Sequence, residues 1–169
     1  MIIIIVLVAI LIISFITDIR KRKILNSVTF PSIIFAFLYY LITQGLEGFF
    51  FSGKGFLVGL CLLIIPYILG GMGAGDVKLM AAIGALMGTS FVFYSFIYTA
   101  LIGGSIALGL ILKQRGIVNS MKSFFYTMVF FRSNLGSMLL AKEKHSSISF
   151  PYGVAITLGT LCALVWGGY

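Results

Sequence analysis

Only four acidic residues occur in this sequence of 169, and two of them stand at the boundaries of apolar segments. Asp18 directly follows the apolar run MIIIIVLVAILIISFIT of residues 1–17, and Asp76 lies in the glycine-rich stretch GMGAGDVKLM of residues 71–80. Two carboxyl groups that face each other in a partly dry site share one proton. One of them then acts as a base on water while the other donates to a carbonyl, which is the chemistry of an aspartic protease.

Each aspartate taken singly also has a structural interpretation. Asp18 could pair with the basic run at residues 20–23, and Asp76 could cap the helix that follows it. A carboxylate at the depth of a membrane boundary is, however, a functional hypothesis by default. Gly73 and Gly75 would allow close backbone approach and pairing with an extended substrate strand. The pair together therefore predicts a catalytic site.

The composition identifies the surroundings of this site as a membrane. Hydrophobic residues make up 60% of the chain and charged residues 9%, with a mean hydropathy of +1.16, against about 25% charged residues in a soluble domain. The apolar runs are continuous rather than alternating, which favours helices over a barrel. We expect one all-α, polytopic membrane domain over residues 1–169. The net charge of +8 indicates basic cytoplasmic loops rather than binding to nucleic acid.

The hydropathy pattern predicts six transmembrane helices. They are expected at residues 1–17, 28–43, 55–69, 77–87, 91–112 and 151–166, with a loop at 44–55. The basic cluster at 20–23 follows the first span, so both termini are predicted outside the cytoplasmic membrane and both aspartates at its cytoplasmic face. The polar region 113–149 is predicted to be a cytoplasmic loop, with an interfacial amphipathic helix at 124–141. A span there would strand Arg132 in lipid.

Three motifs in order resemble those of the type IV prepilin peptidase family. GAGD at residues 73–76, followed by VKLM, is similar to the family's GxGD signature in its GxGDxKL form. DIRKRKILN at 18–26 resembles the first motif, with Leu25 in place of the usual proline. FPYGVAITLG at 150–159 resembles the closing segment.

The resemblance implies a membrane aspartic endopeptidase with Asp18 and Asp76 as catalytic residues and no cofactor. Such an enzyme removes the basic leader of prepilin-like precursors, type IV pilins or pseudopilins, at the cytoplasmic face. Because the chain has no paired CxxC motifs, it resembles the short, peptidase-only form that serves Flp (tight-adherence) pili in protein secretion. Archaeal preflagellin peptidases and other GxGD intramembrane proteases share the core motif and stay open as alternatives.

Supporting roles are expected for residues close to these motifs. Lys78 follows Asp76 by two residues and would reach the interface or the substrate. Asn26 is a good N-cap for the second span, and Pro151 with Gly153 would shape the start of the last helix. Cys61 and Cys162 are far apart in apolar runs, so neither a metal site nor a disulfide is predicted.

Three other functions compete with the protease. A small proton-coupled transporter also uses intramembrane carboxylates, but it predicts inverted repeats, and the sequence contains no internal repeat. A presenilin-type protease shares GxGD, although the basic motif after the first span fits the prepilin form better. The last alternative is a catalytically silent assembly factor of a pilus machine. Serine and zinc protease motifs, GxSxG and HExxH, are missing from the sequence.

Overall fold

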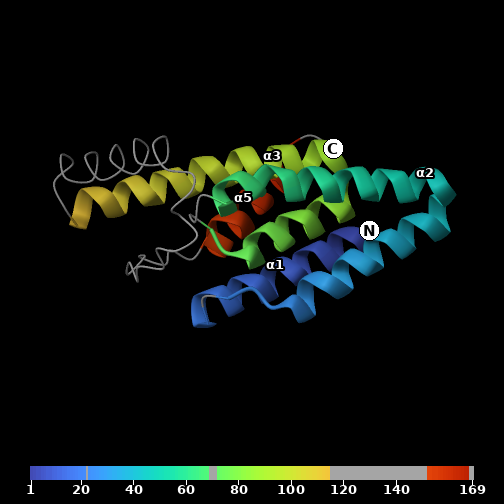
Figure 1. Cartoon of the computed structure of the whole chain (residues 1–169), viewed down its shortest axis with the longest axis horizontal. Helices are drawn as coiled ribbons and strands as arrows, with labels where there is room; N and C mark the ends of the chain where they lie inside the picture. Colours follow the sequence, from blue (N-terminus) through green and yellow to red (C-terminus); the bar gives the residue numbers. More distant parts are fainter. Residues whose placement is uncertain (22, 69–71, 115–151, 168–169) are drawn as a thin grey trace, which may run out of the picture. The chain divides into compact units, whose positions relative to one another are not determined.

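The computed structural model describes residues 1–21, 23–68, 72–114 and 152–167, and these contain four helices and no strand. The helices are α1 (Ile2–Lys21), α2 (Asn26–Ile68), α3 (Ala74–Gln114) and α5 (Tyr152–Trp166) (Figure 1). The predicted all-α class is confirmed. The predicted amphipathic helix at 124–141 lies outside the described residues, as does Pro151.

Two glycines divide the long helices into segments that fold back on themselves. Gly45 in α2 has φ 65° and Gly88 in α3 has φ 84°, a left-handed conformation that glycine adopts without steric cost. Figure 1 shows α2 reversing direction at one end, between its blue and teal halves. The described chain thus holds six helical segments: α1, two in α2, two in α3, and α5.

The break at Gly88 confirms the predicted end of a helix there, but the loop predicted at 44–55 is wrong. Helical structure resumes directly after Gly45 and continues to Ile68. Gly48, Ser52, Gly55 and Gly59 are buried along one face of this segment. Their packing outweighs the low intrinsic helix propensity of glycine, which had suggested a loop.

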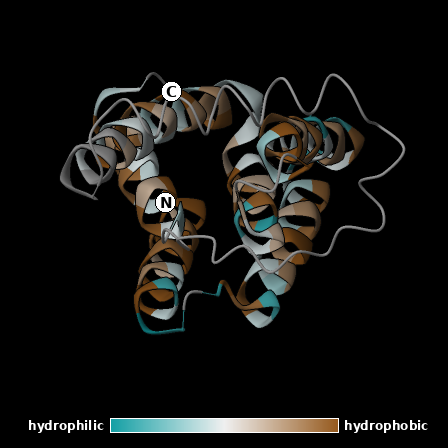
Figure 2. Ribbon diagram, turned by 60° about the vertical axis from the view of Figure 1, so that its left-hand side comes forward, coloured by the Kyte–Doolittle hydropathy of each residue, from teal (hydrophilic) through white to brown (hydrophobic). Residues whose placement is uncertain are grey.

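The helices are those of a membrane protein. Three of them, α1, α2 and residues 74–107 of α3, are long and apolar enough to cross a bilayer, and α5 is a shorter apolar helix. Large apolar side chains point outward, among them Ile5, Ile42 and Trp166, and brown hydrophobic positions dominate the ribbon in Figure 2. Such a surface suits contact with lipid rather than water. The count of six spans stays a prediction.

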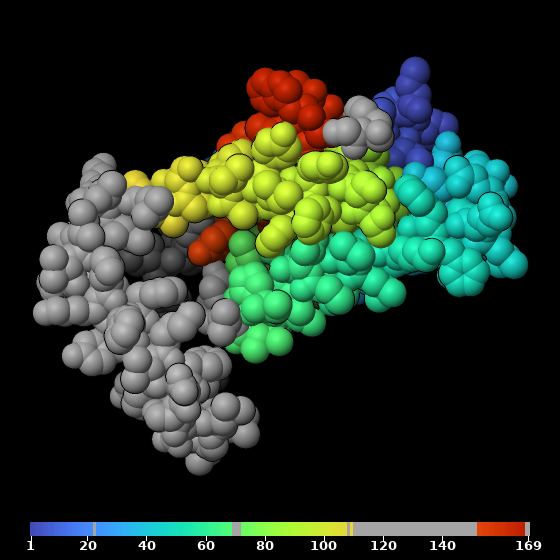
Figure 3. Space-filling model, turned by 90° about the horizontal axis from the view of Figure 1, so that it is seen from above, coloured from blue at the N-terminus to red at the C-terminus, as the bar shows by residue number. Residues whose placement is uncertain are grey.

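The first segment of α3 forms the core, packed closely against the second segment of α2. Leu79, Met80, Ile83 and Leu86 are completely buried. A Cβ atom at Gly84 would overlap the Gly55 carbonyl, and one at Gly59 would overlap the Met80 carbonyl. The two backbones are therefore in direct contact, as small residues permit between membrane helices. Figure 3 shows α3 lying along this part of α2.

Two side-chain hydrogen bonds satisfy backbone carbonyls at the end of this first segment of α3, which we call the central segment. A helix leaves its last four carbonyls without partners, and the break at Gly88 exposes those of residues 84–87. Tyr40 donates its hydroxyl to the Leu86 carbonyl at 2.9 Å, and Ser52 donates to the Ala85 carbonyl at 2.9 Å. Both segments of α2 thus fix the central helix, whose other end carries Asp76.

The described residues fall into two units, residues 1–103 with 152–167, and residues 104–114 at the end of α3. In the first unit α1 packs against α2 and α5. Helix α5 in turn packs against α3, where Gly159 lies directly on Thr99. Both predicted catalytic residues belong to this unit.

Candidate active site

Asp18 lies in the last turn of α1 and is 5% exposed. Its carboxyl group accepts backbone hydrogen bonds from Gly153 and Val154, in the first turn of α5. The contact is close, because a Cβ atom at position 153 would lie 2.7 Å from Asp18 Oδ2. The Oδ2 atom is buried and has no hydrogen-bond partner among the described residues. Asp18 is therefore held at a helix N-terminus with one oxygen free.

Asp76 lies in the first turn of α3. It is 8% exposed, and its Oδ2 atom accepts a hydrogen bond from the Gly73 backbone N–H at 3.0 Å. The Asp76 N–H donates to the Gly73 carbonyl at 3.1 Å. An acidic side chain that reaches back to the N-cap amide is one half of a capping box; the other half needs a side chain that Gly73 lacks. Asp76 therefore satisfies the Gly73 amide, but it lies in the first turn and not at the predicted N-cap position, because α3 begins at Ala74.

The two carboxyl groups lie close enough for the charge of Asp18 to act on Asp76. The structure thereby brings together two residues that are 58 positions apart in the sequence. The carboxyl group of Asp18 lies against the first turn of α5 and Asp76 lies in the first turn of α3, and at both positions the helix dipole and free backbone N–H groups favour a negative charge. Two buried carboxyl groups within range of each other's charge disfavour simultaneous ionisation. Such a pair can hold and polarise a water molecule.

Of the two glycines expected to pair with an extended substrate strand, Gly75 is helical and Gly73 is not. Helix α3 begins at Ala74 instead of Val77, so Gly75 lies within its first turn. A Cβ atom at Gly75 would lie 3.0 Å from Ile24 Cβ, which shows that Gly75 makes room for the connection between α1 and α2. Gly73 is exposed, and its amide holds Asp76. A positive φ occurs, among the described glycines, only at Gly45 and Gly88.

Asn26 and Lys78 form a pair of their own. Lys78 Nζ donates to Asn26 Oδ1 at 3.1 Å and lies 5.3 Å from the centre of the Phe30 ring. The predicted N-cap role of Asn26 is wrong, because the Leu25 carbonyl accepts the first backbone bonds of α2, from Val28 and Thr29. The bond of Asn26 to Lys78 instead ties the start of α2 to α3.

The sequence did not indicate the backbone donors of Gly153 and Val154. A main-chain N–H carries no residue-type signal, and only the resemblance of residues 150–159 to a family motif pointed to this segment. Ser14 was also missed: it is buried one turn before Asp18 on α1, and its Oγ has no hydrogen-bond partner within the described residues. Its position four residues from Asp18 was the available signal.

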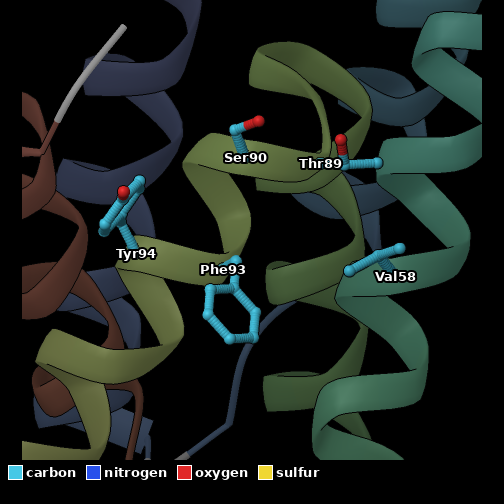
Figure 4. Close-up of a pocket in the computed structure, with 5 residues that line it drawn as sticks. All are labelled: Val58, Thr89, Ser90, Phe93 and Tyr94. Carbon is cyan, nitrogen blue, oxygen red and sulfur yellow. The ribbon is translucent and has the colours of Figure 1, made fainter.

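A groove of about 410 Å³ lies away from the aspartates. It is lined by Val58 of α2 and by Thr89, Ser90, Phe93 and Tyr94 of α3 (Figure 4). Its α3 residues follow the break at Gly88, twelve residues after Asp76, which corresponds to about 18 Å along a helix. The groove therefore belongs to the other end of the central segment. Within the described residues, no group of three or more His, Cys, Asp or Glu side chains could hold a metal ion.

Fold and site together define a helical membrane protein with a buried pair of aspartates at two helix N-termini. The model of the type IV leader peptidase family matches residues 5–108, a range that contains Asp18 and Asp76. The chain therefore belongs to the type IV leader peptidase family, and it is a protease of that family. Comparison with curated proteins and with solved structures gave no significant match.

Proposed function

We propose that this protein is an aspartic endopeptidase of the cytoplasmic membrane that cleaves the basic leader from prepilin-like precursors. The observation that carries this proposal is the pair of buried carboxyl groups within range of each other's charge, in which Asp18 Oδ2 has no hydrogen-bond partner among the described residues. Membership of the type IV leader peptidase family supports the substrate class.

The reaction follows from sharing one proton between the two carboxyl groups. The ionised carboxylate removes a proton from a bound water, whose oxygen attacks the carbonyl carbon of the scissile peptide bond. The protonated carboxyl group donates a hydrogen bond to the carbonyl oxygen and stabilises the negative charge that develops there. Collapse of the tetrahedral intermediate breaks the C–N bond, and a proton passes to the leaving amine. Asp18 Oδ2 is the natural contact for the water, because Asp76 Oδ2 is already bonded to Gly73.

The surroundings of the pair fit an extended peptide. Gly73 is exposed beside Asp76, and without a side chain it leaves its backbone open to a substrate strand. Gly153 allows the close contact of Asp18 with α5, and Gly75 makes room for Ile24 beside the first turn of α3. Asn26, Lys78 and Pro151 complete the proposed substrate side, at the cytoplasmic face of a six-span protein whose termini are both outside.

Co-expression with a prepilin-like substrate tests the proposal, with leader removal followed on a gel. Asp18→Asn and Asp76→Asn should each abolish cleavage, since neither amide can act as a base. Asp76→Asn keeps an oxygen acceptor for the Gly73 amide, so the protein should still accumulate in the membrane. Glu47→Gln is the matched control, because Glu47 is an exposed carboxylate in α2. Substantial cleavage by either aspartate variant would refute the two-aspartate mechanism.

A further inference from the structure

A second cavity, of about 210 Å³, lies between the two segments of α2 and the first segment of α3. Phe30 and Ile33 line it from the first segment of α2, Phe56 and Leu60 from the second, and Val77 and Lys78 from α3. Neither aspartate lines it, and no residue of α5 does. The cavity is therefore separate from the carboxyl pair.

Lys78 supplies the only charge of this cavity's lining. Its ammonium group has three donors, of which one is used by Asn26 Oδ1. Within the part of the chain that the structure describes, Lys78 forms no ion pair with an acidic residue. A lysine in this position therefore has both positive charge and donors to offer to an anion.

The position of the cavity suits a lipid. It lies near the helix starts at Asn26 and Ala74, where a membrane helix reaches the level of the head groups. Phe30 lines the cavity and is also 53% exposed, so the cavity opens toward the outer, apolar surface. An apolar cavity with a cation at its rim matches an amphiphile that carries a negative charge.

We propose that this cavity binds one anionic phospholipid. An acyl chain would occupy the space between Ile33, Phe56 and Leu60, and the phosphate would bind Lys78 beside the Asn26 amide. The lipid would then connect the start of α2 to α3, in the same way as the hydrogen bond between Asn26 and Lys78. The lipid would share Asn26 and Lys78 with the proposed substrate side, but its binding does not require the peptidase reaction.

Native mass spectrometry of the full chain, purified with defined lipids, measures the binding directly. Wild type should retain one phosphatidylglycerol per chain in preference to phosphatidylcholine. Lys78→Gln should reduce this retention about fivefold, the effect of one lysine at an anionic head group. Ile33→Trp should reduce it as well, by filling the cavity. Lys54→Gln removes an exposed cation elsewhere, and Ile34→Trp places the same ring at an exposed neighbouring position, so both should bind like wild type.

Several outcomes would overturn the proposal. If wild type retained phosphatidylcholine as well as phosphatidylglycerol, the charge of Lys78 would not determine binding. If the two control variants lost as much lipid as Lys78→Gln and Ile33→Trp, binding would not depend on this cavity. Competition by inorganic phosphate alone would mean that no acyl chain is involved. Displacement of the lipid by a prepilin-derived peptide would make the cavity a substrate subsite instead. The measurement can be repeated on Asp18→Asn protein, so its result does not depend on the peptidase being active.

Discussion

Gly153→Ala should inactivate the enzyme without unfolding it. A methyl group at this position would lie 2.7 Å from Asp18 Oδ2 and 2.9 Å from Asp18 Cγ, where non-bonded heavy atoms prefer about 3.5–4.0 Å. Helix α5 cannot easily retreat, because Gly159 already lies on the backbone of Thr99. The carboxyl group of Asp18 must therefore move by an amount on the order of 1 Å. A displacement of that size in a catalytic group costs about a hundredfold in rate.

The stability of this variant should change little, because two effects oppose each other. Alanine also restricts the unfolded chain more than glycine, which stabilises a protein by about 0.4–1 kcal/mol and offsets the cost of moving the carboxyl group. The assay compares the rate of leader removal by purified protein with the midpoint of its thermal unfolding in the same detergent. We expect the rate to fall about a hundredfold and the midpoint to stay close to that of wild type.

Gly53→Ala is the matched control, since a Cβ atom there would meet only the Phe37 ring at 3.7 Å, an ordinary contact. It should keep the wild-type rate and gain stability of about 0.5–1 kcal/mol. A Gly153→Ala protein that cleaves at the wild-type rate would refute the reasoning, because Asp18 would then not depend on its contact with α5. A variant that unfolds would show that α5 tolerates no added atom, and the loss of activity would have a different cause.

Three other predictions concern the carboxyl pair and its support. Cleavage should have a bell-shaped pH profile, because both carboxyl groups are protonated at low pH, which removes the base, and both are ionised at high pH, which removes the donor; a profile with one limb only would contradict a shared proton. Tyr40→Phe should lower the free energy of unfolding by about 1–2 kcal/mol, because it leaves the buried Leu86 carbonyl without its partner, and Tyr39→Phe, the neighbouring control, should not. Gly84→Ala should destabilise the protein by about 1–3 kcal/mol, because its methyl group overlaps the Gly55 carbonyl; a thermal midpoint equal to that of wild type would show that the two helices can separate freely.

The aspartates could be predicted because carboxylates are scarce in this chain. With four acidic residues and long apolar runs, a carboxylate at the end of a span has few structural reasons to exist. The all-α class followed equally directly from composition and continuous hydropathy. The two aspartates and the all-α class could be predicted from local sequence alone, without information on which helices are in contact.

The errors lie where contacts between distant segments decide the structure. Residues 44–55 look like a loop because they contain four glycines, yet helical structure resumes after Gly45, where Gly48 packs on the first segment of α2 and Gly55 on α3. Asn26 has the chemistry of an N-cap, but its amide oxygen is bonded to Lys78, 52 positions away. The contact between Asp18 and Gly153 spans 135 positions, and no local pattern encodes it. Propensity therefore misassigned residues whose role is set by tertiary packing.

The glycines of this protein serve two different physical purposes, which substitution can separate. Gly55, Gly59 and Gly84 allow two helix backbones to touch, so any side chain there pushes the scaffold apart. At Gly153 the missing side chain makes space for a reactive carboxyl group rather than for another backbone. A Cβ at position 84 meets a main-chain carbonyl that cannot rotate away, whereas a Cβ at position 153 meets a side chain that can. Alanine at position 55, 59 or 84 should therefore reduce both stability and activity, whereas Gly153→Ala should reduce activity alone.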